Sequence, residues 1–228
     1  MLLRIPHLLT PDQVAHCRAT LAAAAWADGG ETAGEQSRLA KHNLQLPETA
    51  PEAKALGSLV LRAVAANPAF MSAALPLKVF PPLFNLYRPG MAFGDHIDNA
   101  VRVSAVTGAR YRTDLSCTLF LSEPGAYDGG ELVIEAGGLQ PSRVKLAAGD
   151  AILYPATRVH RVEPVARGER LAAFFWVQSM VADEGRRALL HDLDRAIAAA
   201  RRDLGDAHGA AVSLVGVYHN LIRMWAEV

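Results

Sequence analysis

Cysteine is scarce in this chain of 228 residues, which has only Cys17 and Cys117. Two cysteines cannot build a disulfide framework or a metal–thiolate cluster, so both kinds of covalently or metal-stabilised fold are excluded. Cys117 lies inside the apolar run 115–121 and is predicted to be a small buried side chain. A chain of this length can bury a substantial core without such cross-links.

An excess of charge of one sign and long apolar runs are also missing. Lys+Arg and Asp+Glu number 23 each, so nothing points to nucleic acid or to a membrane surface as a partner. No uncharged run reaches the roughly 18 residues that a membrane span requires. Residues 1–7 lack the basic start and the apolar stretch of a signal peptide. We therefore expect a cytoplasmic protein that binds neither nucleic acid nor membrane.

Helical patterns occupy the first third of the chain. Thr10 can cap a helix that begins at Pro11 and continues through 22–25. A polar, glycine-rich loop is expected over 28–38. A second helix fits residues 51–66, and a short third one can follow the Asn-Pro pair after it.

Short β-favouring runs alternate with turns from residue 78 to about residue 180. Seven or eight strands at this spacing are typical of a sandwich or a jelly-roll barrel. Helical patterns return after Ala182, so we divide the chain into 1–77, 78–180 and 181–228. The expected strands are 79–87, 113–121, 131–135, 143–146, 151–154, 159–165 and 171–177. The apolar stripes expected in the last part are Leu189, Leu190, Leu193 and Ile197, and Val212, Val215, Leu221 and Ile222.

The pair His96 and Asp98 is a candidate metal site. In an extended chain, residues i and i+2 face the same side, so the imidazole and the carboxylate can hold one ion. His160, in a distant β-favouring run, can supply a third ligand across a jelly roll. Two histidines and one carboxylate are typical of non-haem Fe(II) sites with open coordination positions. The other histidines lie outside the β-region and are expected to be surface or packing residues: His7, His16, His42, His191, His208 and His219.

Arg170 is a candidate for binding an anionic ligand. Strand alternation places it on one face with Ala172, Phe174 and Trp176. A guanidinium among apolar neighbours is costly to bury without an anionic partner, and a carboxylate ligand would provide one. Two alternatives remain open, a salt bridge with an acid such as Glu163 and simple exposure at the start of the strand.

Several motifs follow one another along the β-region: Tyr87-x-x-Gly90, His96-x-Asp98, Asp128-Gly129-Gly130-Glu131-Leu132, Gly149-Asp150, Pro155, His160 and Arg170. With these motifs in this order, the sequence resembles the 2-oxoglutarate/Fe(II) oxygenases of the prolyl-4-hydroxylase type, and specifically the bacterial PKHD-type hydroxylases. The segments 112–116 and 119–122, with the C-terminal helices, narrow the resemblance to that subgroup.

The resemblance implies an α+β fold with a double-stranded β-helix (jelly-roll) core, N-terminal helices and a C-terminal helical appendage. It implies that His96, Asp98 and His160 bind Fe(II) and that Arg170 binds the C5 carboxylate of 2-oxoglutarate. It also matches Tyr87, Ser116 and Thr118 to positions near 2-oxoglutarate, although each of these three also fits as an ordinary strand residue.

The activity implied is that of an oxidoreductase, a dioxygenase that uses O₂ and 2-oxoglutarate, releases succinate and CO₂, and hydroxylates a C–H bond of its substrate. L-ascorbate (vitamin C) is the supporting reductant of the family. A cupin-like metalloenzyme and a non-catalytic iron or 2-oxoglutarate sensor are the alternatives.

The sequence does not identify the primary substrate. The resemblance suggests a peptide or an iron-uptake-related small molecule, read by loops such as 28–45 and 100–111. The apolar C-terminal helices can also form a homodimer surface.

Overall fold

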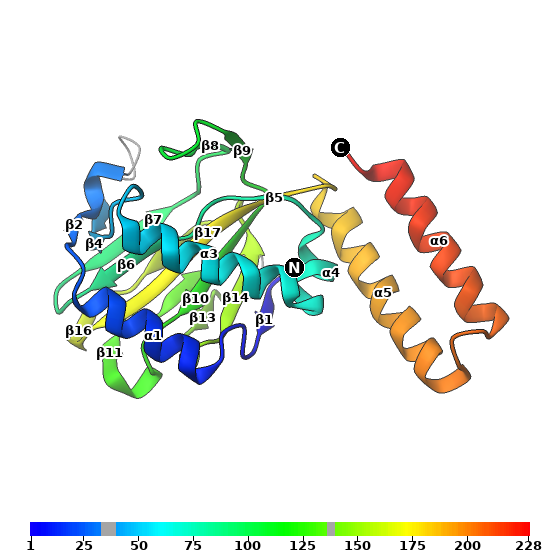
Figure 1. The fold of residues 1–228 in the computed structure, drawn as a ribbon, viewed down its shortest axis with the longest axis horizontal. Helices are drawn as coiled ribbons and strands as arrows, with labels where there is room; N and C mark the ends of the chain where they lie inside the picture. The colour runs from blue at the N-terminus through cyan, green and yellow to red at the C-terminus, as the bar shows by residue number, and fades with distance from the viewer. Residues whose placement is uncertain (33–39, 136–139) are drawn as a thin grey trace.

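The structure is a computed structural model that describes residues 1–32, 40–135 and 140–228. Figure 1 shows α1 and α3 lying across the sheets, while α5 and α6 extend to one side of them. The expected loop 28–38 lies partly outside the described residues. Its described part is not all loop, because Asp28 ends the short strand β2 and a 3₁₀ turn, η1 (Gly29–Thr32), follows.

The first two N-terminal helices begin where the sequence predicts, and the second also ends there, whereas the first ends at Ala22, before the expected 25. Helix α1 (Pro11–Ala22) has a reciprocal capping box, because the Thr10 hydroxyl accepts from Gln13 N–H while the Gln13 side chain accepts from Thr10 N–H. Helices α3 (Pro51–Ala66) and α4 (Pro68–Ala74) follow. No single described helix is long and apolar enough to cross a membrane, although α3 and α4, bent by 83°, pass that test of length and composition together.

Two antiparallel sheets form the core and face one another across the candidate site. The larger sheet has the order β1 (Leu3–Ile5), β14 (Ala151–Pro155), β10 (Leu115–Phe120), β17 (Arg170–Ser179), β6 (Leu83–Tyr87), β4 (Leu44–Gln45) and β2 (Ala27–Asp28), with β5 (Pro76–Val79) also beside β17. The smaller sheet has the order β13 (Ser142–Val144), β12 (Leu132–Ile134), β15 (His160–Val162), β7 (Ala92–His96) and β3 (Lys41–His42). The predicted jelly-roll fold of the α+β class is confirmed.

Two smaller strand pairs extend the barrel. Strand β8 (Val101–Val103) pairs with β9 (Arg110–Arg112), and β11 (Tyr127–Gly129), after the 3₁₀ turn η2 (Pro124–Ala126), pairs with β16 (Val165–Gly168). Strands β8, β9 and β11 are not among the expected strands, and the single strand expected over 159–165 is divided into β15 and the start of β16. The expected strand 79–87 is also interrupted, because Pro81 and Pro82 have no N–H groups to continue a ladder.

The C-terminal segment is a helix pair, α5 (Glu184–Leu204) and α6 (Gly209–Trp225). Of the expected apolar stripe on α5, Leu190 and Ile197 are buried, whereas Leu189 is 61% exposed. Leu189 and Leu190 are adjacent and therefore point about 100° apart on the helix, and only Leu190 meets Leu75 and Val181.

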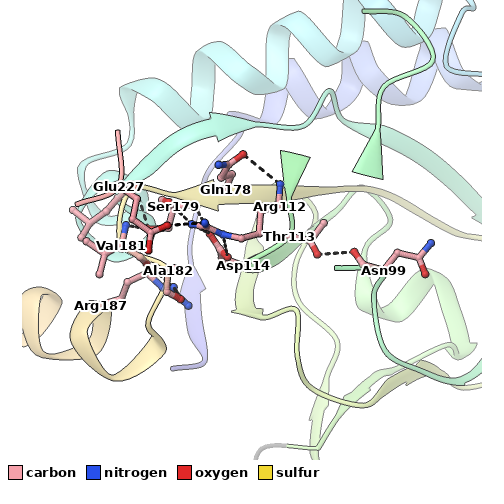
Figure 2. A network of polar contacts seen from close by, with 11 residues as sticks. Asn99, Arg112, Thr113, Asp114, Gln178, Ser179, Val181, Ala182, Arg187 and Glu227 are labelled. Atoms are coloured by element: carbon pink, nitrogen blue, oxygen red, sulfur yellow. Dashed lines mark hydrogen bonds and ion pairs between the residues drawn. The ribbon is translucent and has the colours of Figure 1, made fainter. Parts of the chain in front are cut away.

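A polar network ties the chain end to the barrel (Figure 2). The Arg112 guanidinium donates to the Asp114 carboxylate at 2.7 Å and to Glu227 at 2.7 Å. The Asp114 carboxylate also accepts from the backbone N–H of Ser179 at 2.8 Å. Since Asp114 directly precedes β10, this network links the C-terminal segment to a strand that lines the site.

Candidate active site

His96 and His160 face one another across neighbouring strands of the smaller sheet. They are directly paired residues of β7 and β15, so both side chains project from the same face, and their ring centroids lie 4.2 Å apart. A bulge in β7 between Phe93 and His96 lets the side chains of these two residues lie on the same face. Their rings stack there with a centroid distance of 3.6 Å.

Asp98 completes the cluster from the chain just beyond β7. Its Oδ2 atom lies 3.8 Å from Nε2 of His160 and accepts a short hydrogen bond from the Ser116 hydroxyl. One ligand atom from each of His96, Asp98 and His160 lies within 4.8 Å of the others. This donor set, two imidazoles and one carboxylate on one side of a cavity, suits a divalent iron ion with open positions.

The imidazole tautomers are set by backbone carbonyls. Nδ1 of His96 lies 2.8 Å from the carbonyl oxygen of Gly94, and Nδ1 of His160 lies 2.9 Å from that of Arg158. A carbonyl oxygen only accepts, so each Nδ1 carries the hydrogen and each Nε2 keeps a lone pair for a metal. Burial, together with the neighbouring His160, lowers the pKa of His96 to about 4, so its ring is neutral at pH 7.

Arg170 lies at the start of β17 and is only 1% exposed. Among the described residues its Nε and Nη1 atoms have no hydrogen-bond partner. The alternative of an ion pair with Glu163 is wrong, because Glu163 pairs with Arg161 at 3.0 Å, and exposure at the strand start is wrong as well. A buried guanidinium with unused donors is costly unless an anionic ligand completes it.

Three residues with hydroxyl groups line the same cavity as the cluster and Arg170. Tyr87 is buried directly opposite Arg170 on the neighbouring strand, with the guanidinium carbon 5.3 Å from its ring centroid. Thr118 lies on β10 within reach of the Tyr154 hydroxyl, whose pKa burial raises well above its usual value. Ser116 lines the same cavity, of about 800 Å³ counted out to solvent, but its hydroxyl is used by Asp98.

Sequence and structure comparisons identify the family. The chain is 56% identical over 228 residues, 100% of both chains, to a PKHD-type hydroxylase of Methylobacterium nodulans. It is 55% identical over 229 residues to one of Caulobacter vibrioides, again covering 100% of both. The chain belongs to the PKHD-type hydroxylases. Residues 82–178 match the 2OG-Fe(II) oxygenase superfamily, and residues 184–227 match the PKHD-type hydroxylase C-terminal domain.

Solved structures share the fold of this PKHD-type hydroxylase. A Pseudomonas putida prolyl-4-hydroxylase superposes with a TM-score of 0.53 at 23% identity, covering 78% of this chain and 92% of that one. A Trichoplax adhaerens prolyl hydroxylase gives 0.54 at 12% identity, covering 82% and 86%. The predicted family and reaction class are confirmed: the protein is an oxidoreductase of the 2-oxoglutarate/Fe(II) dioxygenase family. Neither the cupin-like nor the sensor alternative gains support.

Some residues that line the cavity were not singled out in the sequence. Tyr154 looks like any apolar strand residue, and its place beside His160, 5.2 Å between ring centroids, follows from barrel closure. Lys41 and Arg102 lie in the two segments expected to read a substrate, but no pattern there distinguishes them from surface cations.

Proposed function

We propose that His96, Asp98 and His160 hold the Fe(II) ion of this dioxygenase and that Arg170 binds the C5 carboxylate of 2-oxoglutarate. The observation that carries the proposal is the direct pairing of His96 with His160, with Asp98 within 3.8 Å of His160. The bound iron and 2-oxoglutarate supply the oxidising chemistry that uses O₂ and releases succinate and CO₂.

The residues of the chain orient the metal ligands and provide a positive charge for the co-substrate. The carbonyl groups of Gly94 and Arg158 fix the imidazole orientations, and the Ser116 hydroxyl donates to Oδ2 of Asp98 and so orients that carboxylate. The buried Arg170 offers a positive charge and the unpartnered N–H donors of Nε and Nη1, and a charge-assisted hydrogen bond to a carboxylate is stronger than a neutral one.

Tyr87, Thr118 and Ser116 are proposed as further contacts of 2-oxoglutarate. Tyr87 and Thr118 lie in the cavity between the iron ligands and Arg170, with hydroxyl groups that can donate to a co-substrate. For Ser116, the bond to Asp98 supports an additional role in positioning that carboxylate.

The experiment is Fe(II)-dependent formation of succinate from 2-oxoglutarate, with Fe(II) binding measured on the same samples. His96→Ala and His160→Ala should each lose tight Fe(II) binding and succinate formation. His42→Ala, an exposed histidine on β3, is the matched control and should behave as the wild type. Wild-type turnover by either cavity variant would remove that histidine from the proposed set. Binding of iron and 2-oxoglutarate with no turnover for any substrate would favour a sensor.

Several finer properties follow from the family resemblance and the composition. We propose that L-ascorbate supports turnover by keeping the iron reduced, that the protein is cytoplasmic, and that the substrate is a peptide or a small molecule connected with iron uptake. We also propose the division 1–77, 78–180 and 181–228, which is supported by the start of α5 at Glu184 and by the separate family match that begins there.

A homodimer through the C-terminal helices is proposed on the basis of their exposed apolar side chains. Leu189, Val212 and Met224 are 61%, 58% and 73% exposed on α5 and α6. An exposed apolar surface of this kind is typical of an interaction site. Sedimentation should show a dimer that Met224→Lys weakens, and a monomer at all concentrations would contradict this assignment.

A further inference from the structure

The backbone that carries Asp98 is held by a residue outside the cavity. Asp98 lies in the turn between β7 and β8, beyond the paired residues of either strand. The carbonyl oxygen of the next residue, Asn99, accepts from the Thr113 hydroxyl at 2.7 Å (Figure 2). The backbone N–H of Thr113 donates to the carbonyl oxygen of Ala100 at 3.0 Å. Thr113, which is 6% exposed, therefore fixes the turn through two hydrogen bonds.

The same stretch of chain also holds the Asp98 side chain. Ser116, three residues after Thr113, donates its hydroxyl to the Asp98 carboxylate. Between them, the backbone N–H of Asp114 donates to a carbonyl oxygen of β17 at 3.0 Å, which continues the sheet. A shift of this stretch would therefore move the backbone attachment and the side-chain attachment of Asp98 together.

Arg112 connects this stretch to the C-terminal segment. Its guanidinium donates to both oxygens of the Asp114 carboxylate, at 2.7 and 3.1 Å, and to the carbonyl oxygen of Ser179 at 3.2 Å. The remaining nitrogen, Nη1, donates to the Glu227 carboxylate at 2.7 Å. Glu227 is fixed in turn, because its backbone N–H donates to the carbonyl oxygen of Met180 at 2.7 Å.

Both C-terminal helices act on this network. Glu227 follows α6, whose last residue, Trp225, packs against the apolar cluster around Leu190 of α5. Helix α5 also contributes Arg187, which is 3% exposed and interacts electrostatically with Asp114. The place where the helix pair packs therefore determines where the groups around Thr113 lie.

We propose that the C-terminal helix pair positions the metal ligand Asp98. Glu227 orients Arg112, and Arg112 holds the stretch in which Thr113 fixes the turn. The inference rests on the proposed function, in which Asp98 binds the iron. It gives a role to residues 184–227, which match the PKHD-type hydroxylase C-terminal domain. Thr113 and Arg112 are positioning residues, since neither is among the described residues that line the cavity.

The test measures binding of Fe(II) to the full chain by calorimetry without oxygen, at a temperature where every variant is folded. Thr113→Val should weaken Fe(II) binding about tenfold, because groups that orient a metal ligand contribute roughly 10- to 100-fold to affinity. Thr113→Ser keeps the hydroxyl and should bind as the wild type does. Thr107→Val is the matched control, an exposed threonine in the turn between β8 and β9.

Two further variants test the connection to the helix pair. Arg112→Gln should also weaken Fe(II) binding, and in the double variant with Thr113→Val the two effects should not add, because the residues act on one turn. Glu227→Gln should weaken it about threefold, since the Glu227 side chain is 59% exposed and such ion pairs contribute modestly. Asp206→Asn is the matched control, because Asp206 pairs with Arg201 at 2.7 Å between the two helices.

Several results would overturn the proposal. Wild-type Fe(II) affinity in Thr113→Val and Arg112→Gln would do so even if urea unfolding shows lower stability, because a purely structural role changes stability alone. Additive effects in the double variant would mean that Arg112 does not act through Thr113. Glu227→Gln changes an exposed side chain and gives a result even where a buried variant misfolds, and wild-type affinity in it would remove the helix pair from this role.

Asp98→Ala, measured in the same way, separates this inference from the proposed function. Wild-type Fe(II) affinity in Asp98→Ala would refute the proposed function itself. Loss of affinity in Asp98→Ala, together with normal affinity in Thr113→Val and Glu227→Gln, would refute only the positioning role of the helix pair.

Discussion

Replacing Arg170 by methionine should make the ligand-free protein more stable and remove most of its affinity for 2-oxoglutarate. The Arg170 side chain is 1% exposed, and two of its three nitrogens lack hydrogen-bond partners among the described residues. Methionine keeps the length and flexibility of the side chain and removes the buried charge. A purely structural arginine would behave in the opposite way, because its loss would destabilise the fold.

The size of the effect on 2-oxoglutarate affinity and of the effect on stability follows from the contacts of Arg170. Loss of a charge-assisted contact costs about 3 kcal/mol, which is roughly a 100-fold weaker affinity for 2-oxoglutarate. Replacing a buried, incompletely paired charge by an apolar side chain stabilises by about 1 kcal/mol or more. For a chain of this size, 1 kcal/mol corresponds to roughly 3 °C in the melting temperature.

The assay is thermal unfolding of metal-loaded protein with and without 2-oxoglutarate. At a concentration 100 times its Kd, the ligand should stabilise the wild type by about 2.7 kcal/mol and the Arg170→Met variant very little. Arg167→Met is the control, since Arg167 is 63% exposed and pairs with Asp128 at the surface. Destabilisation of ligand-free Arg170→Met by about 2 kcal/mol, or an unchanged response to 2-oxoglutarate, would refute the assignment.

Three further predictions concern the ligands, the metal and the network at the chain end. The pKa of His96 is lowered to about 4 from its ordinary value of 6.5, so the unfolded chain holds more protons between these values. The metal-free protein should therefore lose up to about 3 kcal/mol of stability as pH falls through this window, and His96→Gln should flatten the loss in pH-dependent urea unfolding. Chelation of the metal should abolish most of the thermal shift caused by 2-oxoglutarate, because the co-substrate would lose its contact with the ion. Asp114→Asn should cost about 2 kcal/mol in urea unfolding, since the buried carboxylate accepts from Arg112 and Ser179.

Each of these three predictions has an outcome that would contradict it. A pH dependence of unfolding that is the same in His96→Gln would assign the loss of stability to other groups. A thermal shift that persists in full after chelation would mean that 2-oxoglutarate binds without touching the metal. Wild-type stability of Asp114→Asn would mean that the network at the chain end contributes nothing to the folded state.

The candidate iron ligands could be found from the sequence because their chemistry is local. His96 and Asp98 are two residues apart, and their side chains share a face in any extended chain. Strand propensity did not reveal β7, because its residues include Gly94 and Asp95, which strands disfavour. The pairing of His96 with His160 follows from sheet topology, which only the folded chain provides.

Lys41 and Arg102, which line the cavity, could not be found in this way. Lys41 belongs to the two-residue strand β3, which is too short to show a periodic pattern, and it reaches the site because it pairs with Phe93. Arg102 lies in the three-residue strand β8, and its partner strand β9 is held by a hydrogen bond from the Arg112 N–H to the Gln178 side chain, 66 residues away in the sequence. For a related reason the sequence could not show which residues of the apolar stripe on α5 are buried, since this depends on where the helix pair docks, and Leu189 is exposed.

The most direct measurement compares Asp98→Ala with Asp95→Ala in Fe(II)-dependent formation of succinate from 2-oxoglutarate. Asp98 lies within 3.8 Å of His160, whereas Asp95, on the same stretch of chain, is 62% exposed and pairs with Arg161. Asp98→Ala should lose both tight Fe(II) binding and turnover, while Asp95→Ala should keep both. Wild-type iron binding and succinate formation by Asp98→Ala would contradict the assignment of this cluster as the iron site.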